Sequence, residues 1–247
     1  MSLRLKVIRL FLLVTLSGFL FGRSADVNSQ EDPKPNMVSQ ALPQTEAEDI
    51  QTQIAVFEDS LREEPENIVI LLKLGILYHN LGVEGDKKAV KRARNLFEKL
   101  LELEPQNAEA LAWYGSVLTL RGRDVLFPVS KLSYVNNGIE KMDKAVELAP
   151  DNISVRMIRA NNSLNLPGVF HRIEIAITDF EHLLTLREKR QEEFSKSLLA
   201  KIFLGLGSAY EKKEDTNKAR ENWQKAVEVL PDSMEAEMAR RLLEETK

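Results

Sequence analysis

Apolar side chains recur at regular intervals along most of the chain, and one spacing is repeated at the ends of four helical segments. In each segment a large apolar residue stands eight positions before a proline. The four pairs are Phe57 and Pro65, Phe97 and Pro105, Met142 and Pro150, and Trp223 and Pro231. Proline ends a helix because it lacks an amide hydrogen and clashes with the preceding turn, and Asn or Asp beside it can cap the next helix. The pattern therefore predicts successive helices, each with one apolar side and each closed by its proline.

The segment that ends at Pro231 carries the most complete version of this pattern. No inserted residues interrupt its spacing. Its members are, in order, Phe203, Leu206, Gly207, Tyr210, Ala219, Trp223, Ala226 and Pro231. This arrangement resembles the tetratricopeptide repeat (TPR), a unit of about 34 residues that forms two antiparallel helices. The resemblance implies that Gly207 and Ala219 let the two helices approach closely, while Tyr210 and Trp223 fill the space beside them.

Three earlier stretches resemble the same repeat with interruptions. The four repeats are predicted at residues 66–105, 107–150, 152–188 and 197–231. The second contains extra residues over 121–134, and the third has Glu188 where the closing proline is expected. The resemblance implies an all-α fold, a TPR-type right-handed helical solenoid that spans residues 46–247. It would contain about four helix pairs, an N-terminal extra helix over 46–63 and a C-terminal capping helix over 233–246.

The N-terminus has the pattern of an export signal. Arg4, Lys6 and Arg9 precede an apolar stretch over residues 10–22, with no acidic residue among them. Such a stretch is too short to span a bilayer in the usual way and is typical of a secretory signal peptide. We therefore expect a signal peptide at residues 1–24 and a protein that is exported, periplasmic or secreted. An uncleaved signal that anchors the chain in the inner membrane is the alternative.

Residues 25–45 are rich in Ser, Asn, Gln, Pro and charged residues, which predicts a disordered linker. Removing residues 1–24 would take four basic residues from a chain with 34 basic and 38 acidic ones, which leaves a net charge of about −8. Nucleic acids and anionic membranes attract basic surfaces. The acidic balance therefore argues against a nucleic-acid partner. It also argues against membrane insertion after signal cleavage.

The sequence offers few residues for catalysis. It has no cysteine, and its three histidines, His79, His171 and His182, lack the spacing of metal ligands. It also lacks a G-x-S-x-G motif and a glycine-rich phosphate loop. We therefore predict that the protein is not an enzyme and that it uses neither a metal nor a cofactor.

The resemblance also implies where a partner would bind. TPR arrays receive a peptide or a helix on the concave face formed by the first helix of each pair. On that face we expect Leu72, Ile76, His79, Ala112, Ser116, Met157, Asn161, Leu204 and Ser208. Apolar and weakly polar side chains dominate this set, so a peptide with apolar anchor residues is the expected partner.

Two arginines occupy positions where the family carries large apolar residues. Arg156 and Arg159 are three residues apart and so share one helix face. Because a buried guanidinium needs a counter-charge, Asp143 and Asp179 are expected nearby in an internal salt-bridge network. The alternative is an anion site formed by Lys131, Arg156, Arg159 and Arg172, with Lys131 and Arg172 contributed by two inserted loops.

The inserted stretch Phe127–Tyr134 is unusually apolar for a surface loop. We expect it either to cover the groove as a lid or to fill the groove of its own repeat. Taken together, the sequence predicts a non-catalytic exported scaffold or adaptor that binds a protein or peptide. The rival hypothesis is a small-anion or solute-binding accessory protein of an envelope transport or sensing system. Self-association through the groove is a third alternative.

Overall fold

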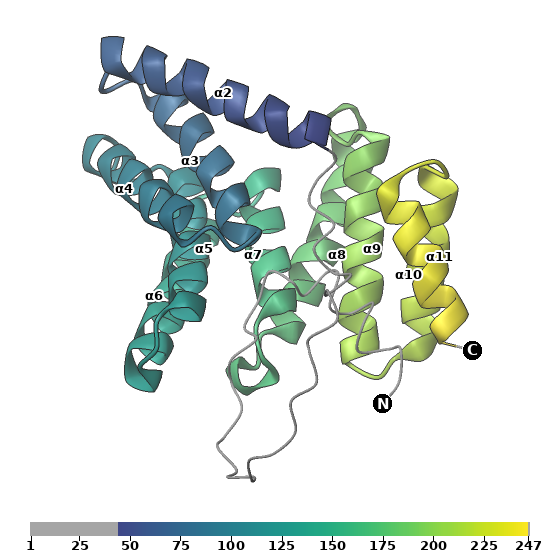
Figure 1. The fold of residues 1–247 in the computed structure, drawn as a ribbon. Coiled ribbons are helices and arrows are strands. Elements are labelled where there is room, and N and C mark those ends of the chain that lie inside the picture. Colours follow the sequence, from purple (N-terminus) through teal and green to yellow (C-terminus); the bar gives the residue numbers. More distant parts are fainter. Residues whose placement is uncertain (1–43, 247) are drawn as a thin grey trace, which may run out of the picture.

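The structure of the protein is a computed structural model that describes residues 44–246 (Figure 1). Within these residues the chain forms ten α-helices and two short 3-10 helices, and it contains no β-strand. The predicted all-α fold is therefore confirmed. The predicted signal peptide at residues 1–24 lies outside the described residues, as does nearly all of the predicted linker at 25–45.

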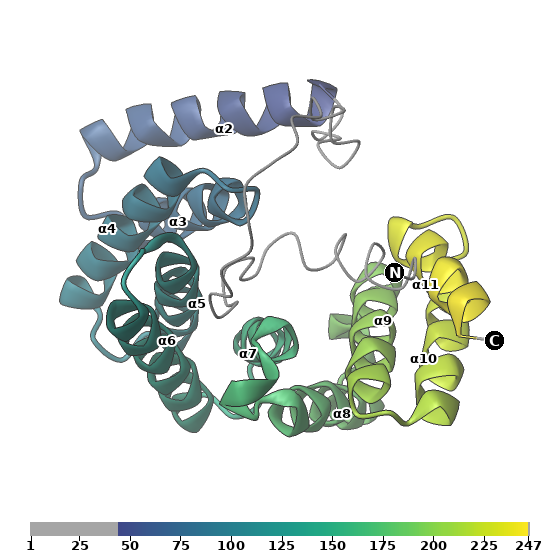
Figure 2. The same cartoon turned by 60° about the horizontal axis from the view of Figure 1, so that its bottom comes forward.

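Eight of the helices form four antiparallel pairs. The pairs are α3 (Ile68–Val83) with α4 (Lys87–Leu103), α5 (Ala108–Asp124) with α6 (Pro128–Leu148), α7 (Ile153–Asn165) with α8 (Ile173–Lys189), and α9 (Lys196–Lys212) with α10 (Thr216–Val229). Figure 2 shows α3, α5, α7 and α9 on the inner side of a curved array, with their partners on the outer side. The predicted solenoid of four helix pairs is confirmed.

One helix at each end completes the array. Helix α2 (Gln44–Glu63) packs on α3 through the buried Ile54, and α11 (Met234–Glu245) packs on α9 and α10 through Ala236, Ala239 and Leu242. The predicted extra helix and capping helix are thereby confirmed. None of the helices over residues 44–246 has the length and apolar character needed to cross a membrane.

The turns between pairs follow the chemistry that the sequence predicts. After each of three closing prolines, an asparagine side-chain oxygen caps the next helix by accepting a hydrogen bond from a backbone amide. The bonds join Asn67 to Ile70 at 3.1 Å, Asn107 to Ala110 at 2.9 Å and Asn152 to Val155 at 3.0 Å. The third pair lacks the proline, and the 3-10 helix η2 (Gln191–Glu193) follows it instead. Proline and asparagine together therefore mark the starts of α3, α5 and α7.

Two glycines bring α5 and α6 into backbone contact. A Cβ atom added to Gly115 would lie 2.6 Å from the carbonyl oxygen of Gly138, and one added to Gly138 would lie 2.5 Å from that of Gly115. Such distances are far below van der Waals contact, and both obstacles are backbone atoms that cannot rotate away. The close packing of this pair therefore requires glycine at both positions.

We expect Gly138→Ala to lower the free energy of unfolding by about 1–3 kcal/mol, because the added methyl group would push α5 and α6 apart. Urea denaturation followed by circular dichroism measures this change. Gly168→Ala is the matched control, since a Cβ there would meet nothing within 4 Å. An equal effect of the two substitutions would contradict the proposed backbone contact.

The inserted stretch over residues 121–134 differs from the expectation, because it lengthens two helices instead of forming a loop. Helix α5 continues to Asp124, and α6 begins at Pro128, where proline is favoured because the first helical amide needs no intrahelical partner. Leu126, Phe127 and Val129 are 87%, 76% and 82% exposed. The prediction that this stretch fills the groove is therefore wrong for Phe127 and Val129, whose side chains face solvent, and the lid stays a prediction.

Candidate functional site

The inner side of the array contains a hollow of about 260 Å³ between α3, α5 and α7, which we call the inner pocket. Three consecutive helix pairs contribute its lining, namely His79, Val83, Trp113, Ser116, Thr119, Leu120, Ser154, Met157, Ile158, Asn161, Asn162 and Asn165. The lining combines apolar side chains with hydroxyl, amide, indole and imidazole groups, and it contains no acidic residue, lysine or arginine. The pocket is therefore suited to a neutral group that can form hydrogen bonds.

A hydrogen-bond network crosses the floor of the inner pocket and ties the three helices together. The Ser116 hydroxyl lies 2.8 Å from Nε2 of His79. The side-chain amide of Asn162 donates to Thr119 Oγ1 at 2.8 Å and to Ser116 Oγ at 3.3 Å, and the Thr119 hydroxyl donates to the Ser116 carbonyl at 2.7 Å. The network fixes the relative positions of α3, α5 and α7, so the pocket is preformed.

His79 is the titratable group of this network. Its ring is 7% exposed and packs edge-on against Trp113, with ring centroids 4.9 Å apart. Nδ1 faces the side-chain oxygen of Asn80 at 3.4 Å, so the ring proton is assigned to Nδ1. Nε2 then accepts a hydrogen bond from the Ser116 hydroxyl. Burial, with a smaller contribution from the positive charge of Arg123, lowers the pKa of His79 to about 4. The imidazole is therefore neutral at pH 7.

Acidification from pH 7 to pH 5 is expected to remove about 2 kcal/mol of folding free energy through His79 alone. The pKa of His79 is about 4 in the folded chain and 6.5 in the unfolded one, so the unfolded chain binds the extra proton between these values. Stability therefore falls as the pH drops from about 6.5 towards 4. Urea denaturation of the wild type and of His79→Gln at both pH values isolates this contribution, because all other groups titrate in both proteins. Identical pH dependence would contradict the buried neutral imidazole.

The structure brings together four of the nine predicted groove residues. His79, Ser116, Met157 and Asn161 all line the inner pocket. That a partner contacts them stays a prediction.

The other five groove residues lie elsewhere. Ala112 and Leu204 are fully buried, so their placement on an open groove is wrong: both side chains point into the packing between helices. Leu72 and Ile76 are half-buried on α3 and pack against its core, and Ser208 lies on α9, where its hydroxyl donates to the Leu204 carbonyl at 3.0 Å. The site is therefore narrower than the predicted groove and is concentrated on α3, α5 and α7.

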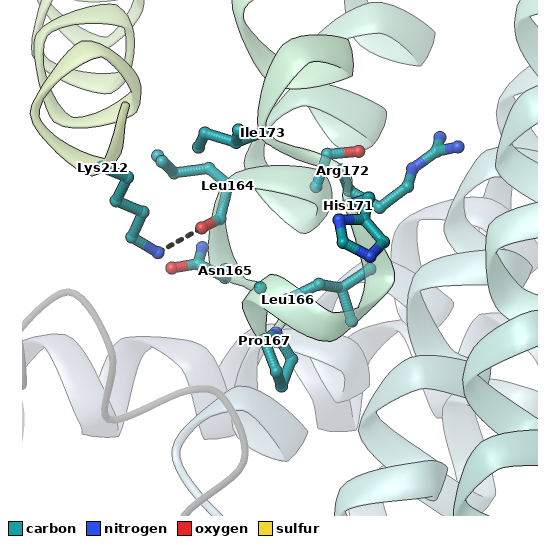
Figure 3. Close-up of a pocket in the computed structure, with 10 residues that line it drawn as sticks. Leu164, Asn165, Leu166, Pro167, His171, Arg172, Ile173 and Lys212 are labelled. Atoms are coloured by element: carbon teal, nitrogen blue, oxygen red, sulfur yellow. Dashed lines mark hydrogen bonds between the residues drawn. The ribbon is translucent and has the colours of Figure 1, made fainter. Parts of the chain in front are cut away.

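A second hollow of about 460 Å³, which we call the turn pocket, lies where α7 ends and the chain turns through η1 (Gly168–Phe170) into α8 (Figure 3). The Lys212 ammonium, at the end of α9, donates a hydrogen bond to the carbonyl of Leu164 there. His171 adopts a left-handed backbone conformation with φ of 52°. In Figure 3 the Arg172 guanidinium points away from this hollow. The turn pocket therefore holds one ammonium group rather than a cluster of free cations.

The guanidinium of Arg172 instead joins a buried ion-pair network. It forms a bidentate pair with Asp143, at 3.0 and 2.5 Å. Arg159 bridges Asp143, at 3.1 Å, and both oxygens of Asp179, at 2.8 Å each. Arg156 donates to Asp179 at 2.6 Å, and Asp179 is fully buried. Asp143 and Asp179 therefore lie beside Arg156 and Arg159, as the sequence predicts.

The arginines of the predicted anion site are paired with carboxylates of the protein itself. Three of its four members, Arg156, Arg159 and Arg172, share the carboxylates of Asp143 and Asp179. Lys131 lies near the start of α6 and takes no part in the network. An external anion would have to displace the fully buried Asp179 carboxylate from Arg156 and Arg159, or the partly exposed Asp143 carboxylate from Arg172, and the first of these is costly. The arrangement therefore favours the internal salt-bridge network over a ligand site.

Eight of the twelve residues that line the inner pocket were not predicted for the groove from the sequence, and Trp113 and Asn162 are two of them. Trp113 and Asn162 each directly follow a residue that was assigned to the groove. A helix places neighbouring positions about 100° apart, so residues chosen from one ideal helix face omit neighbours that also reach the pocket. The run of Asn161, Asn162 and Asn165 on one helix is the signal that could have located the polar side of the pocket.

The remaining histidines do not form a metal site. His182 Nε2 lies 2.8 Å from Asp151 on the surface, and His171 is exposed. Among residues 44–246 no group of three or more His, Asp or Glu side chains is placed to hold a metal ion.

Comparisons with known proteins agree with the fold. The tetratricopeptide repeat family profile matches residues 200–232, which include most of α9 and all of α10. The structure is similar to that of a thermophilic TPR protein from Thermus thermophilus, with 17% sequence identity, a TM-score of 0.64, and coverage of 81% of this chain and 94% of that one. It is less similar to YrrB, a TPR protein with an unusual peptide-binding site, with 21% identity, a TM-score of 0.45, and coverage of 80% and 86%. No curated protein matches the sequence. The α9–α10 pair is thus a tetratricopeptide repeat, and the chain as a whole has the fold of tetratricopeptide repeat proteins.

Proposed function

We propose that the protein is a non-catalytic scaffold or adaptor that holds an extended peptide segment of another protein on its inner side. The observation that carries this proposal is the inner pocket, which three consecutive helix pairs build on the concave side and which presents polar and apolar side chains together. Peptide recognition by a preformed groove uses this combination, since apolar contacts supply affinity and fixed polar groups supply orientation.

The rival hypothesis of a small-anion protein has less support. Its arginines are occupied by Asp143 and Asp179, and the lining of the inner pocket contains no cationic side chain at neutral pH. A volume of about 260 Å³ is also smaller than the roughly 300–1,000 Å³ that is usual for a pocket that encloses a whole ligand. One side chain of a longer peptide matches this size better than a free solute does.

Selection of peptides from a random display library against the full chain tests the proposed function. We expect the selected peptides to bind Asn161→Arg at least about tenfold more weakly than the wild type, because the larger cation would obstruct the inner pocket and cost about 1.4 kcal/mol or more. Asn137→Arg on the outer helix α6 introduces the same side chain at an exposed position and should leave binding unchanged. Equal binding to all three proteins would overturn the proposal.

We further propose that this binding takes place outside the cytoplasm. The basic residues and apolar stretch over residues 4–22 support export, although they lie outside the described residues. A fusion of residues 1–45 to a reporter enzyme that is active only after export should be active in a bacterial host. Mass spectrometry of the N-terminus distinguishes cleavage near residue 24 from an uncleaved anchor. An inactive fusion would contradict export.

A further inference from the structure

Two polar atoms in the lining of the inner pocket have no hydrogen-bond partner within residues 44–246. They are Nε1 of Trp113, which is a donor, and Oδ1 of Asn162, which is an acceptor. Both atoms are shielded from solvent. A buried polar atom without a partner costs about 1–3 kcal/mol of folding free energy, so each such atom needs an explanation in a folded protein.

The other polar groups around these atoms are already engaged. The Asn162 amide nitrogen donates to Ser116 and Thr119, the Ser116 hydroxyl faces His79, and the Asn165 amide donates to the Asn161 carbonyl at 2.8 Å. Rotating the Asn162 amide by a half-turn would satisfy its oxygen only by breaking two hydrogen bonds. The network therefore fixes the Asn162 oxygen as an unpaired acceptor, and the Trp113 ring, which carries the unpaired donor, packs on His79 in the lining of the same hollow.

The charge of the pocket narrows the class of ligand. Its lining contains no acidic residue, lysine or arginine, and a carboxylate or ammonium moved into it would lose hydration without gaining a counter-ion. The Glu109 carboxylate, which accepts from the Ser154 hydroxyl at 2.6 Å, would repel an anion further. The complementary group is neutral, and it offers one acceptor to Trp113 and one donor to Asn162. A primary carboxamide has this combination.

We propose that the inner pocket is a recognition site for the side-chain carboxamide of a glutamine or asparagine in the bound peptide. The volume of about 260 Å³ accommodates one such side chain, and Trp113, Ile158 and Met157 would contact its methylene groups. Contact with the two shielded atoms requires the lining to open slightly, and Met157, which is part of that lining, is unbranched and has flexible torsions that let it move at low cost. This inference rests on the proposed function and specifies the chemistry of its anchor residue.

Blocked amino acids test the inference on the full chain, because each presents one side chain without charged termini. The probes are the N-acetyl, N-methylamide derivatives of glutamine, glutamate and methionine, which have side chains of similar length. We expect the glutamine probe to bind with a dissociation constant of about 1 mM, as ligand efficiency allows for a fragment of this size. We expect the other two probes to bind at least about tenfold more weakly, since each leaves a buried polar atom unpaired.

The indole N–H signals in a two-dimensional nitrogen–proton spectrum give the readout. The sequence has two tryptophans, and Trp223 is fully buried in another part of the core. The glutamine probe should move the Trp113 signal downfield as its N–H gains an acceptor, and it should leave the Trp223 signal in place. Trp113→Phe assigns the signal by its disappearance.

Trp113→Phe also tests the contact, because it removes the donor and keeps an aromatic ring. We expect about tenfold weaker binding of the glutamine probe, followed through backbone amide shifts. Tyr114→Phe is the matched control, since it removes a polar group that hydrogen-bonds to Glu98 outside the pocket. Equal binding of the three probes, or an unchanged Trp113 signal, would overturn the inference. If display peptides still depend on Asn161 in that case, the proposed function stands and only the anchor chemistry is wrong.

Discussion

Asp179→Ala should lower the free energy of unfolding by about 3–5 kcal/mol, because it leaves buried positive charge without its partner. Asp179 is fully buried and accepts hydrogen bonds from both Arg156 and Arg159. Those two side chains are 9% and 12% exposed, so water cannot replace the carboxylate. Asp143 already pairs with Arg172 and has no capacity to neutralise both remaining arginines.

Urea denaturation of the variant and of a matched control measures this effect. Asp151→Ala is the control, because its side chain is 62% exposed and pairs with His182 at the surface. Surface ion pairs contribute about 0–1 kcal/mol, so the control should unfold almost as the wild type does. A loss below about 1 kcal/mol for Asp179→Ala would mean that the three arginines are solvated. The anion-site hypothesis would then regain support.

Trp223→Ala is expected to cost about 3–5 kcal/mol, which is typical of removing a fully buried large aromatic side chain. The indole fills the space between α9 and α10 that Gly207 leaves open. A Cβ atom on Gly207 would lie 2.5 Å from Cδ1 of the indole. Without the ring, the two helices would enclose a cavity or collapse towards each other, and both outcomes lose packing free energy.

The corresponding measurement is the midpoint and slope of urea denaturation, with Met234→Ala as the control. Met234 is 69% exposed at the start of α11, so its truncation should change stability by less than about 0.5 kcal/mol. A similarly small loss for Trp223→Ala would show that the indole is not part of the core. The register of the best-matching repeat would then be wrong.

The fold could be predicted from the sequence because its determinants are local. Prolines at 65, 105 and 150 end helices, and the asparagines two residues later cap the next ones. The stretch over residues 121–134 was misjudged because comparison with an ideal repeat reveals only that residues are extra. Whether extra residues form a loop or lengthen the helices depends on local signals such as proline at a first helical position, which Pro128 supplies.

The site was harder to predict than the fold. His79, Ser116, Met157 and Asn161 were found because they share the inner side of the first helices. Ala112 was assigned to the groove, but its side chain is buried in the helix packing, and the next residue, Trp113, lines the pocket instead. The acids that pair with Arg156 and Arg159 followed from charge alone, since buried guanidinium groups require them. Which polar atoms remain unpaired depends on the final geometry, and no sequence pattern reports it.

The most direct test of the central claim is amide hydrogen exchange of the full chain with and without a peptide selected by display. We predict that the peptide slows exchange mainly in α3, α5 and α7, around the inner pocket. Protection confined to the outer helices, or to the exposed turn around Phe127 between α5 and α6, would place the partner on a different surface. That result would contradict the inner pocket as the binding site.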